Sequence, residues 1–175
     1  MSTRRVRTAV LGHESATPYS PAGVGYAVLA LRLAMGWVFF NTGVSRLLSS
    51  GWDTHTFAGT IPPSNPGAEV VAALATRAPW ALEVCLTYGF ALVGVGLLFG
   101  AFFRLNALVG GALMGATWVT SLSVQAGGFV NPYLIYVLVL FGLVAFGAGR
   151  VVGLDALFEG HSLVERHPRL RLLLG

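Results

Sequence analysis

The stretch LEVCLTYGFALVGVGLLFGAFFRLNAL, residues 82–108, decides the fold. It joins one apolar run, at residues 79–100, to a second, at residues 105–124, through a four-residue link that contains Arg104. A link this short forces two helices to lie antiparallel. Each run has about 18 to 25 residues, which at 1.5 Å per residue matches a hydrocarbon layer of about 30 Å. The stretch therefore predicts a hairpin of transmembrane helices.

Two more apolar runs, at residues 24–48 and 132–149, complete a predicted set of four membrane helices. The 175-residue chain is 55% hydrophobic and 10% charged, with a mean hydropathy of +0.72, which is too apolar for a soluble domain. We therefore expect an all-α integral membrane four-helix bundle at residues 24–149, with an external loop at residues 49–78. An N-terminal arm at residues 1–23 precedes the bundle, and a basic amphipathic tail at residues 150–175 follows it.

The distribution of arginine predicts the orientation. With both termini in the cytoplasm, eight of the eleven arginines lie inside and only Arg77 lies in the outer loops, as the positive-inside rule requires. This predicts a multi-pass protein of the cell membrane. Because the arginines lie near helix ends and form no single stripe, nucleic-acid binding is not expected. The inner arginines are Arg4, Arg5, Arg7, Arg104, Arg150, Arg166, Arg169 and Arg171.

Three charged side chains fall inside the predicted spans: Arg32, Arg46 and Glu83. A charge within a bilayer costs about 2.5 to 3.5 kcal/mol on insertion scales and needs a partner. Helix geometry places Arg46 about 15 Å and Glu83 about 10 Å to the outer side of the membrane centre. Arg32 lies about 6 Å to the inner side. We therefore predict a pair between Arg46 and Glu83, as a tie between helices or as a ligand contact. Arg32 is expected to reach inner headgroups or neighbouring carbonyl groups.

The outer half of the predicted bundle also gathers polar side chains, which could line a pocket. Four of them are candidates for binding a cofactor: Asn41, Thr87, Tyr88 and Trp118. No metal, haem or flavin is predicted, because all four histidines lie outside the spans and none pairs with another at helical ligand spacing. The single cysteine, Cys85, excludes a dithiol mechanism within the chain.

Three segments resemble the DoxX/DoxD family of membrane proteins. LRLAMGWVFFNTGVSRLL, residues 31–48, is similar to the first helix of the family, which carries an early Arg and a Gly shortly before a second basic residue. Residues 82–108 are similar to the second helix, with its acidic start, Gly-rich run and Arg at the turn. FGAGRVVGLDAL, residues 146–157, resembles the closing segment. The family's acidic residue falls on Glu83, and its basic residues fall on Arg32, Arg46, Arg104 and Arg150.

The resemblance implies a bundle linked to respiratory quinone chemistry, since DoxD-type members are described as the membrane subunit of thiosulfate:quinone oxidoreductase. In that hypothesis Glu83 and Arg46 are catalytic: quinone oxygens meet Arg46, Asn41 or Tyr88, and Glu83 relays a proton. A non-catalytic accessory subunit of a respiratory or other membrane complex is the alternative, and a transporter is a third. The expected partners are membrane lipids, other membrane or respiratory-complex subunits, and a second copy of the chain.

Overall fold

The computed structural model describes the backbone of residues 4–10, 13–122 and 128–155, and the side chains of residues 20–122 and 128–155. The chain begins with an antiparallel ribbon of two strands, β1 (Arg4–Val10) and β2 (His13–Tyr19), which pairs Arg4 with Tyr19 and Val10 with His13. The ribbon was not expected for the N-terminal arm. From residue 21 onward the regular elements of the described chain are helices, as the sequence predicts.

The first long helix, α1, covers Pro21–Leu48, and the Ser20 hydroxyl accepts a hydrogen bond from the amide of Gly23 at its start. Two short helices follow in the loop, α2 (Thr54–Gly59) and α3 (Ala68–Arg77). The second long helical segment runs through α4 (Pro79–Glu83), the π-helical turns of η1 (Val84–Gly89) and α5 (Phe90–Phe99). The remaining elements are α6 (Phe103–Thr120), α7 (Pro132–Ala145) and the short 3-10 helix η2 (Ala148–Arg150).

Two helices of the described chain, Pro21–Leu48 and Pro79–Phe99, are long and apolar enough to cross a membrane. The helix at Pro132–Ala145 is apolar but shorter, and its 14 residues extend only about 21 Å. It ends at Ala145, four residues before the predicted end of the span, because Gly147 adopts a φ of +63° and turns the backbone into η2. The prediction of four full-length spans is therefore confirmed, by length and composition, for the first two.

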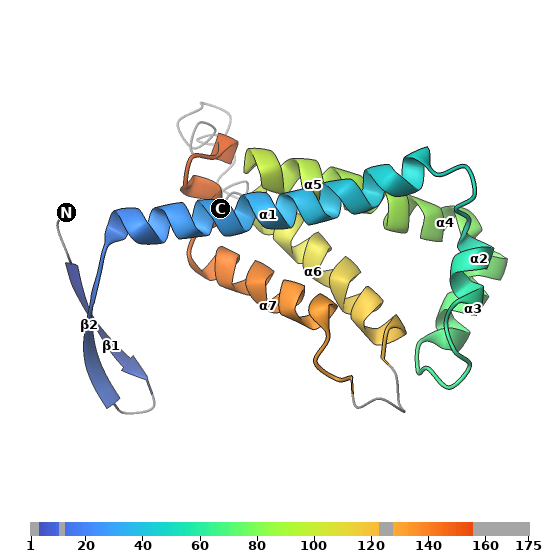
Figure 1. The fold of residues 1–175 in the computed structure, drawn as a ribbon, viewed down its shortest axis with the longest axis horizontal. Coiled ribbons are helices and arrows are strands. Elements are labelled where there is room, and N and C mark those ends of the chain that lie inside the picture. Colours follow the sequence, from blue (N-terminus) through green and yellow to red (C-terminus); the bar gives the residue numbers. More distant parts are fainter. Residues whose placement is uncertain (1–3, 11–12, 123–127, 156–175) are drawn as a thin grey trace, which may run out of the picture.

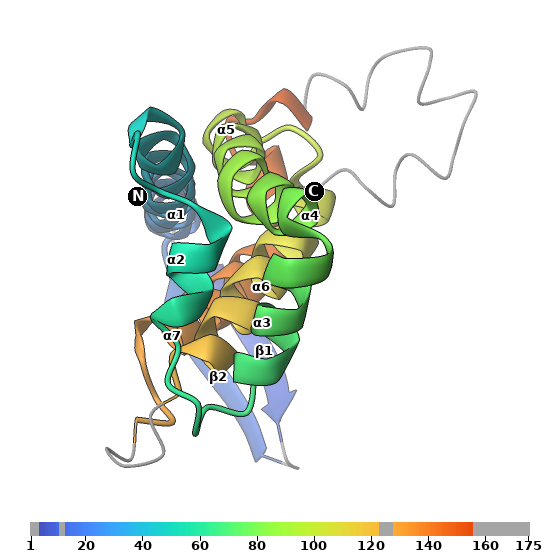
Figure 2. The same ribbon diagram turned by 90° about the vertical axis from the view of Figure 1, so that its right-hand side faces the viewer.

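The long helices pack in pairs (Figure 1). α1 lies along α5, and α6 lies along α7, while α5 also contacts α6 and α1 also contacts α7. The short helices α2 and α3 cover one end of these four helices (Figure 2). In the core, the rings of Phe39 and Phe90 stack with centroids 5.4 Å apart, and both side chains are almost fully buried. These contacts place the polar side chains of the interior close to helix ends and turns.

Glycine permits the closest contact, which is between α1 and α5. A Cβ atom added to Gly43 would overlap the backbone of Ala91, and one added to Gly94 would overlap the backbone of Phe40. Small residues allow membrane helices to approach in this way. Gly111 and Gly115 of α6 differ, because a Cβ atom there would meet nothing within 4 Å. Those two glycines make no close helix contact in the described structure.

Candidate functional site

Arg46 occupies the end of α1 that faces α2 and α3, and its side chain is half-buried. Its Nη1 donates a hydrogen bond of 2.5 Å to the carbonyl oxygen of Leu86 in η1. The guanidinium carbon lies 5.0 Å from the ring centroid of Phe90 and 5.4 Å from that of Trp52. Both distances are within the range of cation–π attraction. Arg46 is therefore a cation held between two aromatic rings and a backbone carbonyl.

The π-helical turns of η1 give this site its second feature. Such turns widen a helix and occur often at functional sites. Thr87 lies in η1 next to Leu86, its side chain is 3% exposed, and its hydroxyl finds no hydrogen-bond partner among the described residues. Most buried hydroxyl groups are hydrogen-bonded, so an unsatisfied one needs an explanation such as a water or a ligand. Thr87 thus remains a candidate for binding a cofactor.

The predicted ion pair between Arg46 and Glu83 is wrong in this structure. Glu83 is exposed. Arg46 bonds instead to the backbone of Leu86, which lies three residues after Glu83 in the chain. Depth along a helix axis does not determine the direction of a side chain around that axis. Glu83 ends α4 and points away from the core, whereas the carbonyl of Leu86 faces α1.

The other predicted binding residues lie apart from Arg46 or on the surface. Asn41 and Tyr88 are exposed. Trp118 donates a 2.8 Å hydrogen bond from its indole nitrogen to the carbonyl oxygen of Phe129, and the two rings meet edge to face. Trp118 therefore holds the connection between α6 and α7. Of the predicted set, only Arg46 and Thr87 lie at the same helix contact.

Two residues near Arg46 were not assigned to the binding site from the sequence. Tyr133 lies in the first turn of α7, close enough to Arg46 for its ionised form to affect the guanidinium, and Tyr136 packs edge to face on Tyr133. Trp52 supplies one of the two rings around the cation. Aromatic residues at such positions commonly anchor a helix at the membrane interface. A pattern search for aromatic residues at the same depth as Arg46 would have found them.

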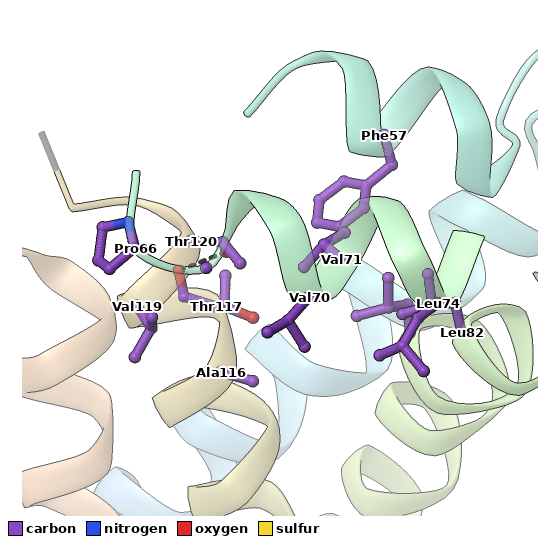
Figure 3. Close-up of a pocket in the computed structure, with 12 residues that line it drawn as sticks. Phe57, Pro66, Val70, Val71, Leu74, Leu82, Ala116, Thr117, Val119 and Thr120 are labelled. Carbon is purple, nitrogen blue, oxygen red and sulfur yellow. Dashed lines mark hydrogen bonds between the residues drawn. The ribbon is translucent and has the colours of Figure 1, made fainter. Parts of the chain in front are cut away.

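An apolar pocket adjoins this site (Figure 3). It has a volume of about 340 Å³ and lies between the loop helices α2 and α3 and the longer helices. Phe57 enters from α2, Val71 and Leu74 come from α3, and Ala116 comes from α6 (Figure 3). Leu86 takes part in both the pocket and the Arg46 site. It lines the pocket, and its carbonyl oxygen accepts the hydrogen bond from Arg46. The pocket is suited to a hydrocarbon group and not to a charged one.

At the opposite end of α1, Arg32 lies in a second polar cluster. Its side chain is 2% exposed, and its Nη atoms donate hydrogen bonds to the carbonyl oxygens of Ala148 at 2.8 Å, Val151 at 2.7 Å and Val152 at 3.1 Å. The expectation that Arg32 bonds to neighbouring carbonyl groups is confirmed. These carbonyls follow α7, where a helix end leaves acceptors unsatisfied. Arg32 thus has a structural role.

Two further buried residues hold the ends of α6. The Asp155 carboxylate accepts hydrogen bonds from the amides of Phe102 at 2.7 Å and Phe103 at 2.9 Å, where the helix begins. At the other end, the Asn65 amide nitrogen donates to the carbonyls of Val119, Thr120 and Leu122 at 2.8 to 3.0 Å. A carboxylate suits the positive end of a helix dipole, and an N–H donor suits the negative end. Neither role was predicted.

Among the described residues, no three His, Cys, Asp or Glu side chains form a group that could hold a metal ion. The comparison with known families is more informative. The family model DoxX matches residues 27–125, which is more than half of the chain. The chain belongs to the DoxX family. No curated protein and no solved structure matches it.

The DoxX match begins within α1 and extends beyond the end of α6. It includes Arg32, Arg46 and Thr87, whereas Tyr133 and Asp155 lie after it. DoxX membership together with the apolar helices indicates a membrane protein. The residues around Arg46 therefore combine positions inside and outside the matched region.

Proposed function

We propose that this DoxX protein is a subunit linked to respiratory quinone chemistry and binds a quinone ring beside Arg46. The observation that carries the proposal is the Arg46 guanidinium itself, held between Trp52 and Phe90 with one hydrogen bond to Leu86. In the described part of the chain its other N–H groups donate no hydrogen bond. They are suited to a quinone carbonyl oxygen, and the aromatic rings suit a planar ligand.

The surroundings of Arg46 support the same ligand. Thr87, next to Leu86 in the chain, has a buried hydroxyl without a hydrogen-bond partner among the described residues, and the apolar pocket lined by Leu86 has room for part of an isoprenoid tail. Tyr133 adds a phenol that can donate to oxygen. Quinone sites need such a combination, with a few polar groups on an otherwise apolar wall.

The finer architecture that we propose is a four-helix bundle in the cell membrane with both termini in the cytoplasm. In this arrangement α1, the segment from α4 to α5, α6 and α7 are the four spans, and Arg46 lies near the outer face. Reduction of a quinone takes up two electrons and two protons. Electrons come from a small reduced sulfur compound at the outer face, and the exposed Glu83 relays protons.

The test is equilibrium binding of decylubiquinone to the full chain in nanodiscs, followed by quenching of tryptophan fluorescence. Arg46→Gln is expected to weaken binding by about tenfold or more, since a charged hydrogen bond contributes roughly 1.5 to 3 kcal/mol. Thr87→Val is a second variant, and it removes a hydroxyl that makes no hydrogen bond to the described residues. Arg77→Gln, an exposed arginine of α3, is the control. Unchanged binding in both site variants would refute the proposal.

A non-catalytic accessory subunit is the second candidate. The observation in its favour is that Arg32, Asn65 and Asp155 all bond to backbone groups of this chain, so these hydrogen bonds serve the fold. Purification in mild detergent, with absorption spectra and lipid extraction of the co-purified material, distinguishes the two. Quinone at one molecule per chain favours the first candidate, whereas haem proteins without bound quinone favour the second.

A further inference from the structure

A second apolar cavity lies between α6 and α7, away from Arg46. This groove has a volume of about 520 Å³ and is lined by one charged residue, Arg104, together with apolar residues and glycine. Gly111 and Phe141 belong to its walls, one on each helix. We infer that the groove between α6 and α7 is a binding site for an anionic phospholipid, with the lipid phosphate at Arg104 and one acyl chain along the groove.

The charge at the mouth of the groove points to an anion. Arg104 lies in the first turn of α6 and is exposed, and no hydrogen bond or ion pair links it to any other described residue. A guanidinium group binds phosphate oxygens through two parallel N–H groups. Basic residues between membrane helices, at the level of the headgroups, recognise anionic lipids in the same way.

The shape of the groove matches a lipid chain. On α6 it extends from Arg104 to Ala112, which is eight residues or about 12 Å along the helix. On α7 it extends from Val137 to Val144, and this antiparallel helix supplies the opposite wall. A bilayer leaflet contributes about half of a 30 Å hydrocarbon layer. The groove therefore has the length of much of one acyl chain, with the cation at one end.

The lining also argues against a protein as the occupant. No acidic residue lines the groove, and Leu108 and Phe141 are 73% and 74% exposed. A second copy of the chain would have to bring its own acid to Arg104 as well as fill the groove. A phospholipid carries the anion and the hydrocarbon in one molecule and is present at every exposed face of a membrane protein.

The experiment is native mass spectrometry of the delipidated full chain, titrated with phosphatidylglycerol or phosphatidylcholine. We expect the wild-type chain to prefer phosphatidylglycerol by about fivefold, because one arginine near a membrane surface strengthens the binding of an anionic lipid by about that factor. Arg104→Gln should remove the preference, and Gly111→Leu should reduce binding of both lipids by filling the groove. The matched controls are Arg77→Gln and Gly115→Leu. Gly115 lies one turn beyond Gly111 in the same helix and does not line the groove.

The glycine variants keep the test independent of folding. A Cβ atom meets nothing within 4 Å at either Gly111 or Gly115, so neither site is tightly packed in the described structure. A preference for phosphatidylglycerol that survives in Arg104→Gln would overturn the proposal. So would wild-type lipid binding in Gly111→Leu, or a dimer that this variant dissociates while no lipid is bound. None of these measurements depends on whether a quinone binds at Arg46.

Discussion

Arg32 donates a 2.7 Å hydrogen bond from Nη1 to the carbonyl oxygen of Val151, which lies 119 residues later in the chain. The same side chain bonds to Ala148 and Val152, so one buried cation satisfies three carbonyls where the chain leaves α7. Within this apolar chain, the arrangement stabilises an irregular segment without water. It also joins α1 to the end of α7, which are distant in sequence.

Replacement of Arg32 by Met is expected to destabilise the protein by roughly 3 kcal/mol, since buried carbonyls would lose their donor. Thermal unfolding in detergent measures the effect. Arg77→Met, an exposed arginine on α3, is the control and should change stability by no more than about 0.5 kcal/mol. Equal melting temperatures for the Arg32→Met variant and the wild-type chain would contradict the structural role of Arg32.

Asn65 provides a test in which the hydrogen-bond donor is removed and the acceptor is kept. Asn65→Asp keeps the oxygen that accepts from the amide of Gly67 at 2.7 Å, but it places a carboxylate against the carbonyls of Val119, Thr120 and Leu122. We expect it to cost at least as much as Asn65→Ala, on the order of 1 to 3 kcal/mol. Hydrogen exchange at the end of α6 and in α3 should be faster in both variants. Exchange in Asn65→Asp as slow as in the wild-type chain would show that the donor is unimportant.

The contact between α1 and α5 predicts opposite results for two glycines. Gly43→Ala should destabilise the protein by about 1 to 3 kcal/mol, because its methyl group would overlap the backbone of Ala91. Gly115→Ala should be neutral or slightly stabilising, because the added methyl meets nothing within 4 Å. Thermal unfolding of the two variants measures these changes. Similar losses of stability at both sites would argue against the close packing of α1 on α5.

The environment of Asp53 predicts a pH dependence in the loop that follows α1. Its carboxylate caps α2, and hydrogen bonds from the Thr56 hydroxyl, followed by the Thr56 and His55 amides, hold the pKa of Asp53 below its ordinary value. A lowered pKa in the folded state means that the cap contributes fully above the unfolded-state pKa of about 4. The contribution is lost as the pH falls through the lower folded-state pKa.

Hydrogen exchange of the α2 amides should therefore become faster, relative to Asp53→Asn, as the pH falls below about 4. Removal of the largest cause in Thr56→Val should move this change toward higher pH. A wild-type profile that matches that of Asp53→Asn at every pH would show that the Asp53 carboxylate does not cap α2 in solution.

Helix positions were predictable because apolar runs and their breaks are local signals. The predicted start of the second span at residue 79 agrees with Pro79, and the predicted end of the first at residue 48 agrees with Leu48. The expected carbonyl partners of Arg32 also follow from the cost of a buried cation. These predictions needed only composition, spacing and helix geometry.

The partners of Arg46 were not predictable in the same way. The choice between Glu83 and the carbonyl of Leu86 depends on how the helix is rotated, and the widened turns of η1 change that rotation. Asp155 and Asn65 act on α6 from 52 or more residues away in the chain, so no local pattern marks them as caps. Phe102 stands at the N-cap position and has no side-chain oxygen, which is the one local indication that α6 needs an acceptor from elsewhere.

The two caps of α6 also determine when the helix can be completed during synthesis. Asn65 leaves the ribosome before α6 does, but Asp155 follows Phe103 by 52 residues. The first turn of α6 therefore enters the translocon with its leading amides unbonded to the residue that will satisfy them. Its final anchoring must wait until α7 has also been made, so insertion and completion of this helix are separate events in time.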